Sequence, residues 1–427
     1  MGARGVAHGE AQTRIPAFAW GPVGSAMAGL AVALTATSAG YGYHRDELYF
    51  RMLPPQWGYV DQPPLTPWLV KALSAVADEV WSIRILATLA AVATSMLVAL
   101  VARELGGGGF GQGLAAWGYG FAAFPLVFGH VALTTGVDLL AWVGAALFVV
   151  RAVTRDEPRW WLAFGAVVGA ATWNKLLAAF LVVALAVGFA TVGPRRLPWR
   201  WVLGGVLIAA ALALPALVYQ VTHAWPQLTM GRALSARNGA ENRVLLAPML
   251  FLLLGPLLVP IWVAGLVSLW RRREVRFLAV SFAALLVLSA VSAGQVYYPL
   301  GLLAVVYAAG CVAVERWRHR GLVVATVTVN ALVAAVISLP LIPVSVVGGT
   351  PVPGINQAAR DSVGWPGYVQ QVASVYASLS PAERAGAVVV TNNYGEAGAI
   401  ARYGPALGLP AALSGQNELW FLGRPPT

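Results

Sequence analysis

The chain has 427 residues, of which 59% are hydrophobic and only 11% are charged. Soluble domains are typically about 45–50% apolar, so this composition excludes a soluble protein and indicates an integral membrane protein. The net charge of +11, from 28 Lys and Arg against 17 Asp and Glu, is better explained by arginines at the inner membrane surface than by a nucleic-acid partner. A single cysteine, Cys311, excludes an intramolecular disulfide.

The first apolar segment covers residues 21–40 and follows a polar N-terminal segment that contains Arg4 and Arg14. Small residues at 37–40 leave a cleaved signal peptide as the alternative interpretation. The apolar run is longer than a usual signal core, and many further spans follow it. We therefore expect an uncleaved first transmembrane helix.

An outer loop, residues 41–80, follows this first segment and contains three carboxylates: Asp46, Glu47 and Asp61. Asp46 and Glu47 come directly after the membrane exit, where a charge costs far less than at mid-bilayer. Prolines in the segment 54–64 fix φ and so hold Asp61 in one place. We interpret the loop as an active-site loop at the membrane surface, with a solvated helix exit as the alternative.

The end of this loop has an apolar repeat at helical spacing, from Leu65 to Val76. Thr66 is placed to cap the predicted helix, and Pro67 lies in its first turn. Such an amphipathic helix is expected to lie in the membrane interface rather than to cross the bilayer.

Further apolar segments along the chain are long enough to cross a bilayer, which takes about 20 residues. They cover residues 81–102, 112–129, 135–152, 159–173, 175–192, 201–221, 246–269, 276–293, 296–314 and 321–344. With the first segment, the sequence predicts about eleven transmembrane helices. The pair 159–173 and 175–192 is the least distinct, because only a short polar break divides it.

The distribution of Lys and Arg predicts the orientation of these spans. With the N-terminus inside, sixteen of the 28 basic residues fall in short inner segments and eight in outer loops, as the positive-inside rule requires. This orientation places the opening loop on the outer face together with Asp138, Lys175, His223 and residues 295–299. We therefore expect a multi-pass plasma-membrane protein with an outward-facing site.

The composition changes near residue 346, where Gly, Pro, Asn and Ser rise and apolar runs shorten. Residues 367–379 show helical spacing, 387–391 form a predicted buried strand, and 396–403 form a second predicted helix. We expect a small extracytoplasmic α/β domain over 346–427, after an all-α transmembrane catalytic domain over 1–345. A domain this small is expected to pack against the membrane part.

The acidic pair at 46–47, followed by Trp-Gly-Tyr-Val-Asp-Gln-Pro-Pro-Leu at 57–65, resembles the first outer loop of glycosyltransferase family 39. These are the dolichyl-phosphate-mannose protein mannosyltransferase-like proteins of the GT-C superfamily. Weaker similarities follow in the family's order, at residues 134–138, 169–177, 223–226, 297–299 and 392–398. Gln295 stands where the family often has a basic residue.

The resemblance implies a GT-C-like membrane enzyme that moves a sugar from a polyprenyl-phosphate donor to an acceptor hydroxyl. It implies Asp46 as the catalytic base, which position also favours, with Glu47 beside it. For substrate binding the candidates are Asp61, Asp138, Lys175, His223, Tyr297 and Tyr298. A phosphate leaving group needs little protonation, so the reaction requires no strong general acid. It requires a base to take the proton of the acceptor hydroxyl and a cation to hold the phosphate. Lys175 is the expected phosphate partner, and a lysine that extends to the interface is its alternative.

Two other classes of function remain open from the sequence: a transporter or flippase of lipid-linked sugars, and an inactive relative that acts as a scaffold. The clustering of acids at one face and the lack of a visible internal repeat favour an enzyme over a transporter. No cofactor is firmly implied, and His44 beside the acidic pair leaves a divalent metal open. The sugar and the acceptor are not determined by any spacing in the sequence.

Overall fold

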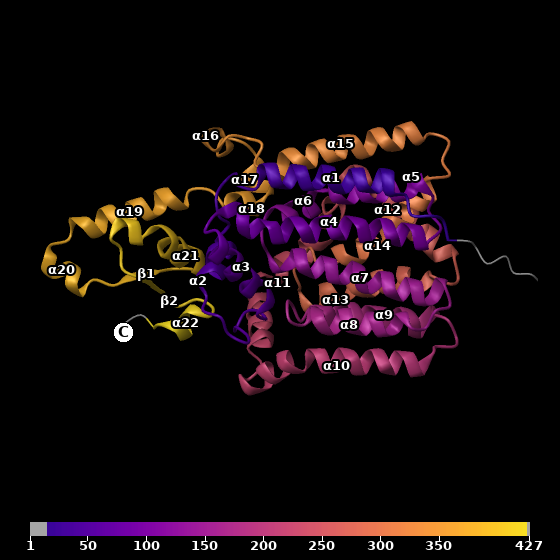
Figure 1. Ribbon diagram of the computed structural model, residues 1–427, viewed down its shortest axis with the longest axis horizontal. Coiled ribbons are helices and arrows are strands. Elements are labelled where there is room, and N and C mark those ends of the chain that lie inside the picture. The colour runs from indigo at the N-terminus through magenta and orange to yellow at the C-terminus, as the bar shows by residue number, and fades with distance from the viewer. Residues whose placement is uncertain (1–14, 425–427) are drawn as a thin grey trace, which may run out of the picture.

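The computed structural model describes residues 15–424, so Arg4 and Arg14 lie outside the described residues. A bundle of long helices and a smaller C-terminal unit lie end to end (Figure 1). The bundle helices are α1 (Trp20–Thr37), α4 (Val80–Glu104), α5 (Gly109–Gly120), α6 (Ala123–His130), α7 (Thr134–Thr154), α8 (Trp160–Ala171), α9 (Ala178–Val192), α10 (Trp199–Thr222), α11 (Pro226–Leu252), α12 (Val259–Arg271), α13 (Arg276–Ser292), α14 (Leu300–Val314) and α15 (Arg320–Ser338).

Four of the described helices are long and apolar enough to cross a membrane by themselves: α4, α7, α10 and α15. A fifth span results if the bent pair of α11 and α12 is counted as one. Shorter apolar helices of 12 to 17 residues, α8, α9, α13 and α14, lie beside them. The molecule is thus a mostly helical multi-pass protein, and the count of eleven spans stays a prediction.

Helix α14 forms the centre of the bundle. It is apolar all round, and nearly every residue from Leu300 to Val314 is buried. It packs against α4, α5, α7, α12 and α13. A helix without a polar face has to be enclosed on every side, and α14 is enclosed by these neighbours.

The predicted span over 246–269 is wrong as a continuous helix. α11 ends at Leu252, and the axis turns by 70° before α12 begins. Gly255 has a φ of +107°, which a glycine adopts readily. The freed carbonyl of Leu254 accepts a hydrogen bond of 2.9 Å from Asn330 Nδ2, so the break leaves this polar group satisfied. The predicted span over 112–129 is likewise divided, into α5 and α6.

The opening loop folds into two short helices, α2 (Arg45–Met52) and α3 (Leu65–Val76). The helix predicted over 65–76 is therefore present, and its place in the membrane interface stays a prediction. Its N-cap residue is Pro64, and the predicted Thr66 cap is wrong, because the Thr66 hydroxyl bonds Asn174 Oδ1 at 2.6 Å instead. α3 buries Thr66 and Val70 against the protein and leaves Val76, at its C-terminal end, 85% exposed.

The C-terminal unit is built from short elements after α15. They are α16 (Val344–Val347), α17 (Val352–Ile355), α18 (Gln357–Arg360), α19 (Trp365–Ser378), α20 (Pro381–Gly386), β1 (Val389–Thr391), α21 (Tyr394–Tyr403), β2 (Ala412–Ser414) and α22 (Leu419–Leu422). β1 and β2 pair in parallel. The two predicted helices and the predicted strand correspond to α19, α21 and β1. The prediction that this strand is buried is wrong, because Val390 at its centre is 56% exposed.

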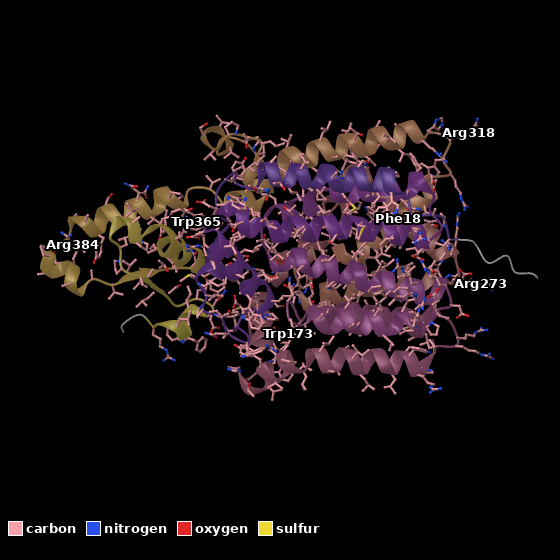
Figure 2. The ribbon with its side chains drawn as sticks, in the orientation of Figure 1. Phe18, Trp173, Arg273, Arg318, Trp365 and Arg384 are labelled. Atoms are coloured by element: carbon pink, nitrogen blue, oxygen red, sulfur yellow. The ribbon has the colours of Figure 1, made fainter. Side chains whose placement is uncertain are left out.

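The two ends of the bundle differ in composition. Figure 2 shows Arg273 and Arg318 at the end farthest from the C-terminal unit, and Trp173 at the end nearest to it. The helices of the opening loop, α2 and α3, lie at this near end, between the bundle and the C-terminal unit (Figure 1). The inner and outer segments that the sequence predicts therefore collect at opposite ends.

Candidate active site

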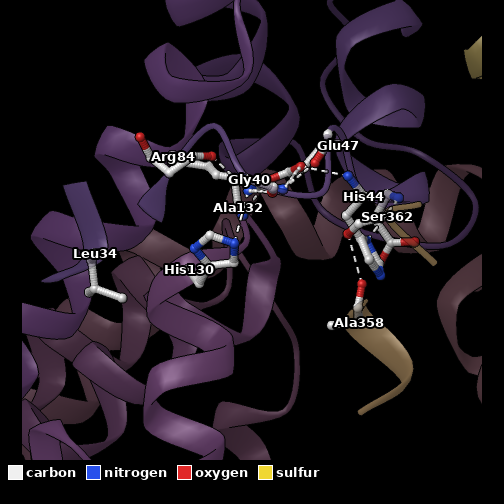
Figure 3. Close-up of polar contacts among 12 residues, drawn as sticks. Leu34, Gly40, His44, Glu47, Arg84, His130, Ala132, Ala358 and Ser362 are labelled. Atoms are coloured by element: carbon white, nitrogen blue, oxygen red, sulfur yellow. Dashed lines mark hydrogen bonds and ion pairs between the residues drawn. The ribbon is translucent and has the colours of Figure 1, made fainter. Parts of the chain in front are cut away.

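A buried ion pair anchors α2 to the bundle. Glu47 is fully buried, and its carboxylate binds Arg84 at 3.0 Å through both oxygens. The backbone N–H groups of His44 and Ala132 donate to the same carboxylate at 2.7 and 2.9 Å. Figure 3 shows this network, with His130 Nε2 at 3.0 Å from Arg84. Four donors therefore occupy the carboxylate, which makes Glu47 a support for α2.

Arg84 also binds the chain that enters α2. It donates to the carbonyls of Ser38, Gly40 and Gly42, the shortest of these bonds being 2.7 Å. A buried charge has to be both paired and hydrogen-bonded to persist, and the guanidinium satisfies both conditions. Because Glu47 caps the first turn of α2 and Arg84 binds the preceding loop, the pair fixes the position of Asp46.

Asp46 lies in the first turn of α2, and its side chain is 28% exposed. The hydroxyl of Tyr394, from the C-terminal unit, donates to its Oδ1 at 2.7 Å. Arg45 Nε lies 3.7 Å from the same oxygen. The backbone N–H of Asp46 donates to His44 Nδ1 at 3.1 Å. The carboxylate is thus oriented by the protein and remains accessible.

Asp61 is placed beside this group by the proline-rich segment. Its carboxylate accepts from the Tyr49 hydroxyl at 3.2 Å and from Asn417 Nδ2 at 3.0 Å. Burial raises the pKa of Asp61 from 3.8 to about 7, and the neighbouring acids Glu418 and Asp46 add to the rise. Asp61 can therefore hold a proton near neutral pH, unlike an ordinary aspartate.

Glu418, from the C-terminal unit, lies beside Asp61 in the same cluster of acids. It is 5% exposed, and its Oε2 accepts from the backbone N–H of Val60 at 2.9 Å. Burial raises the pKa of Glu418, while His223 lowers it. The His223 ring is exposed, stacks on Tyr219 at 4.1 Å and is bound through Nδ1 to the Tyr219 carbonyl. His223 therefore lies at the edge of the acidic group.

Lys175, Tyr297, Tyr298 and Asp138 form a second group at the same end of the bundle. The Lys175 amine lies 5.3 Å from the ring centre of Tyr297 and 5.5 Å from that of Tyr298. Asp138, one turn into α7, is 4% exposed, and its Oδ1 has no hydrogen-bond partner within residues 15–424. Lys175 is close enough to Asp138 for their charges to interact. The break between α8 and α9 thus places a cation beside a buried acid.

Hydrogen bonds join this second group to the opening loop. Asn174, next to Lys175, bonds Thr66 of α3 and donates to the Thr134 carbonyl at 2.8 Å. The Leu65 N–H donates to the Trp173 carbonyl at 2.9 Å. Glu47 reaches Ala132, two residues before α7. The expected gathering of the candidate residues at one end is therefore observed, as two adjoining groups.

Contributors to the site that were absent from the sequence-based candidates include Arg84, Tyr394, Asn417 and Glu418. A lone arginine near the start of an apolar span was a usable signal for Arg84, because such a charge requires a buried partner. Asn417 and Glu418 carry no such signal, since their contacts join positions 356 and 358 residues apart.

The described residues contain no group of three His, Cys, Asp or Glu that could hold a metal ion. His44, the residue that leaves a metal open in the sequence, uses Nδ1 as the N-cap acceptor of α2. The chemistry available to the site is therefore that of an accessible carboxylate, a second acid with a raised pKa, and a cation at the helix break.

Comparison with known proteins finds a family match over part of the chain. Residues 61–219 match the family model described as dolichyl-phosphate-mannose-protein mannosyltransferase. The lipid A galacturonosyltransferase RgtD of Rhizobium johnstonii is 26% identical over 171 residues, which are 39% of this chain and 35% of that protein. The chain is similar to this family over the matched segment. The match to RgtD spans about a third of that relative's length.

A similarity of fold extends over nearly the whole chain. The crystal structure of ArnT from Cupriavidus metallidurans bound to undecaprenyl phosphate has a TM-score of 0.60 and 15% identity, and covers 94% of this chain and 88% of that one. The apo structure of the same ArnT has a TM-score of 0.57 and 14% identity, covering 92% and 86%. This likeness establishes the fold.

Proposed function

We propose that this GT-C protein is a membrane glycosyltransferase that moves a hexosyl or pentosyl group from a polyprenyl-phosphate donor to an acceptor hydroxyl. The observation that carries the proposal is the accessible Asp46 carboxylate, held by Tyr394 and by the Glu47–Arg84 pair at the end of the bundle where Lys175 also lies. The similarity to RgtD and the undecaprenyl phosphate bound to ArnT support a lipid-linked donor.

The proposed reaction requires one base and one cation. Asp46 accepts the proton of the acceptor hydroxyl. At the same time, the oxygen of that hydroxyl forms a bond to the anomeric carbon of the sugar. The bond between this carbon and the phosphate oxygen breaks, and the polyprenyl phosphate leaves with both electrons. Lys175 balances the charge on the phosphate, and in a partly desolvated site this attraction is much stronger than in water.

The remaining candidates take supporting parts in this proposal. Glu47 positions α2, because its oxygens are occupied by four donors. Asp138 and the two tyrosines around Lys175 line the phosphate and sugar side. Asp61 and His223 line the acceptor side. The site faces outward from the plasma membrane, residues 1–345 form the catalytic membrane domain, and residues 346–427 form an extracytoplasmic domain that closes over it.

The test is sugar transfer by membranes that contain the Asp46→Asn variant. Membranes are supplied with a panel of radiolabelled polyprenyl-phosphate sugars, and label that leaves the carrier for a second molecule is measured. Asp46→Asn is expected to lower transfer by at least about 100-fold, the lower end of what a positioned base contributes. Retention of undecaprenyl phosphate, measured on the purified protein, is expected to stay unchanged.

Glu157→Gln is the matched control, because Glu157 makes an exposed ion pair with Arg159 just after the C-terminal end of α7, whereas the start of α7 adjoins the Glu47 contact. It is expected to keep wild-type transfer. Near-normal turnover by Asp46→Asn would remove Asp46 from the role of base. Label that crosses the membrane while staying on its carrier would instead identify a flippase.

A further inference from the structure

We propose that Tyr394 is a positioning residue for the Asp46 carboxylate, which the C-terminal unit supplies to a site otherwise built by the membrane bundle. The inference rests on the proposed function, in which Asp46 is the base. It assigns to the C-terminal unit a direct part in catalysis, through one phenol hydroxyl.

The contact is short and specific. Tyr394 Oη donates to Asp46 Oδ1 at 2.7 Å across 348 positions of sequence. Among residues 15–424, Arg45 is the other side chain that binds this carboxylate, and its Nε is farther away at 3.7 Å. The Tyr394 ring lies 4.8 Å from that of Tyr49, and the Arg45 guanidinium lies 5.4 Å from its centre. The phenol is therefore fixed on two faces.

The start of α21 is built to hold Tyr394 in this place. Asn393 caps the helix by accepting from the N–H of Glu396 at 3.0 Å, and the Glu396 carboxylate bonds back to Asn393 and to the N–H of Asn392. The backbone N–H of Tyr394 donates to Gln416 Oε1 at 3.0 Å. Caps of this kind fix the first turn of a helix, and Tyr394 is the first residue of α21.

Two glycines bring α21 against α2. A Cβ added at Gly398 would lie 2.8 Å from the backbone of Leu48, and one added at Gly395 would lie 2.7 Å from the side chain of Arg45. Only glycine permits this close approach of α21 to α2, and the approach brings the phenol of Tyr394 to Asp46. The stretch 392–398 thus consists of a cap, the phenol and the two glycines that allow close packing.

A separate pair of contacts joins the C-terminal unit to the other acid of the loop. Asn417 donates to Asp61, and Glu418 accepts from the N–H of Val60. Asn417 has a φ of +54°, a left-handed conformation that asparagine tolerates better than most residues. Because the unit contacts the loop at both acids, its contact with Asp46 is part of a continuous docking surface.

The hydroxyl orients the base. It holds one carboxylate oxygen of Asp46 so that the other faces the acceptor. Arg45 approaches the same oxygen at 3.7 Å and is itself paired with Asp361 at 3.3 Å. Tyr394→Phe removes the phenol hydroxyl and leaves these charged neighbours unchanged, so its effect reports the phenol contact alone.

The experiment compares Tyr394→Phe with wild type in the transfer assay. We expect kcat to fall about 10- to 100-fold, the range that a misplaced catalytic group produces, with the donor KM unchanged. Tyr376→Phe is the matched control, because Tyr376 lies in the same unit and donates to the Arg384 carbonyl away from the site. It is expected to behave as wild type.

Gln416→Ala provides a second variant that keeps the phenol. It removes the side chain bound to the Tyr394 backbone, and we expect a smaller fall in kcat of the same kind. If Asp46→Asn is inactive while Tyr394→Phe retains the wild-type kcat, the positioning role is wrong and the proposed function stands. If Asp46→Asn is active, the assignment of Asp46 as the base is wrong, and the positioning role is wrong with it. A Tyr394→Phe variant whose only defect is a lower thermal stability also overturns the proposal.

Discussion

Asp61 carries its carboxyl group between the Tyr49 hydroxyl and the Asn417 amide, where burial raises its pKa to about 7. In the unfolded chain the pKa returns to its ordinary value of 3.8. Between about pH 4 and pH 7, folded Asp61 therefore keeps a proton that the unfolded chain releases. Unfolding is favoured as the pH rises through this window, and the destabilisation is complete above about pH 7.

Replacing Asp61 with asparagine removes this penalty, since asparagine resembles the protonated acid and carries no charge. We expect the melting temperature of Asp61→Asn to match that of wild type near pH 4 and to exceed it at pH 8. Scanning calorimetry or dye-monitored unfolding of the purified protein across this range measures the difference.

Asp78→Asn is the opposite control. Its hydrogen bond with Arg51 lowers the pKa of Asp78, so this acid contributes stability that is present at neutral pH and is lost on acidification. The two variants should therefore differ from wild type in opposite directions at pH 8. If the melting temperature of Asp61→Asn followed that of wild type in parallel from pH 4 to pH 8, the raised pKa of Asp61 would be contradicted.

The sequence predicted which residues gather at this end of the bundle and could not predict which of them stay accessible. Asp46 and Glu47 are adjacent and look equivalent in the sequence. Their environments differ because α2 turns Glu47 toward Arg84 and Ala132, which buries it fully, and turns Asp46 toward the C-terminal unit. The partners that decide between the two acids are distant in the chain, so no local pattern records them.

At the level of helices, the packing of α21 on α2 depends on Gly398, whose missing side chain lets the two backbones meet. We expect Gly398→Ala to separate the helices and to destabilise the docked C-terminal unit by about 1–3 kcal/mol, the usual cost of overpacking. Limited proteolysis of the purified protein should then cut the connection near residues 346–364 faster. Sugar transfer should fall together with docking.

Gly367→Ala is the matched control, because a Cβ at this exposed position in α19 meets no atom within 4 Å. Alanine favours a helix by up to about 1 kcal/mol relative to glycine, so this variant should be neutral or slightly more stable. Equal proteolysis rates for the two alanine variants would show that the close approach of α21 is not required.

Long helices were predictable where apolar residues run without interruption, as in α4, α7 and α10. The prediction failed where the chain breaks inside an apolar run. Between α11 and α12, a glycine with positive φ and a carbonyl bound by Asn330 permit a turn of 70°. Asn330 lies 76 positions from its partner, so hydropathy alone shows no break there.

The whole molecule has one end rich in arginine and an opposite end that holds the opening loop and the C-terminal unit. Arg273 and Arg318 lie at the first, and the opening loop, Trp173 and the C-terminal unit lie at the second (Figure 2). Trp57, Trp68 and Trp173 form a cluster at the second end with ring centres 5.5 to 6.0 Å apart. Aromatic residues are typical of the membrane interface, and Ala72 and Val76 of α3, which are exposed, fit the same position.

This polarity predicts the orientation of the protein in the membrane. Because basic loops stay in the cytoplasm, we expect the end with Arg273 to be inside and the C-terminal unit outside. Cys311 is fully buried, and after its replacement with alanine, single cysteines are introduced at the exposed positions Ser378 and Glu274. In intact cells, a membrane-impermeant maleimide should label Ser378→Cys and leave Glu274→Cys unlabelled. Both should react once the membrane is permeabilised. Labelling of Glu274→Cys alone in intact cells would reverse the orientation and place the Asp46 site on the cytoplasmic face.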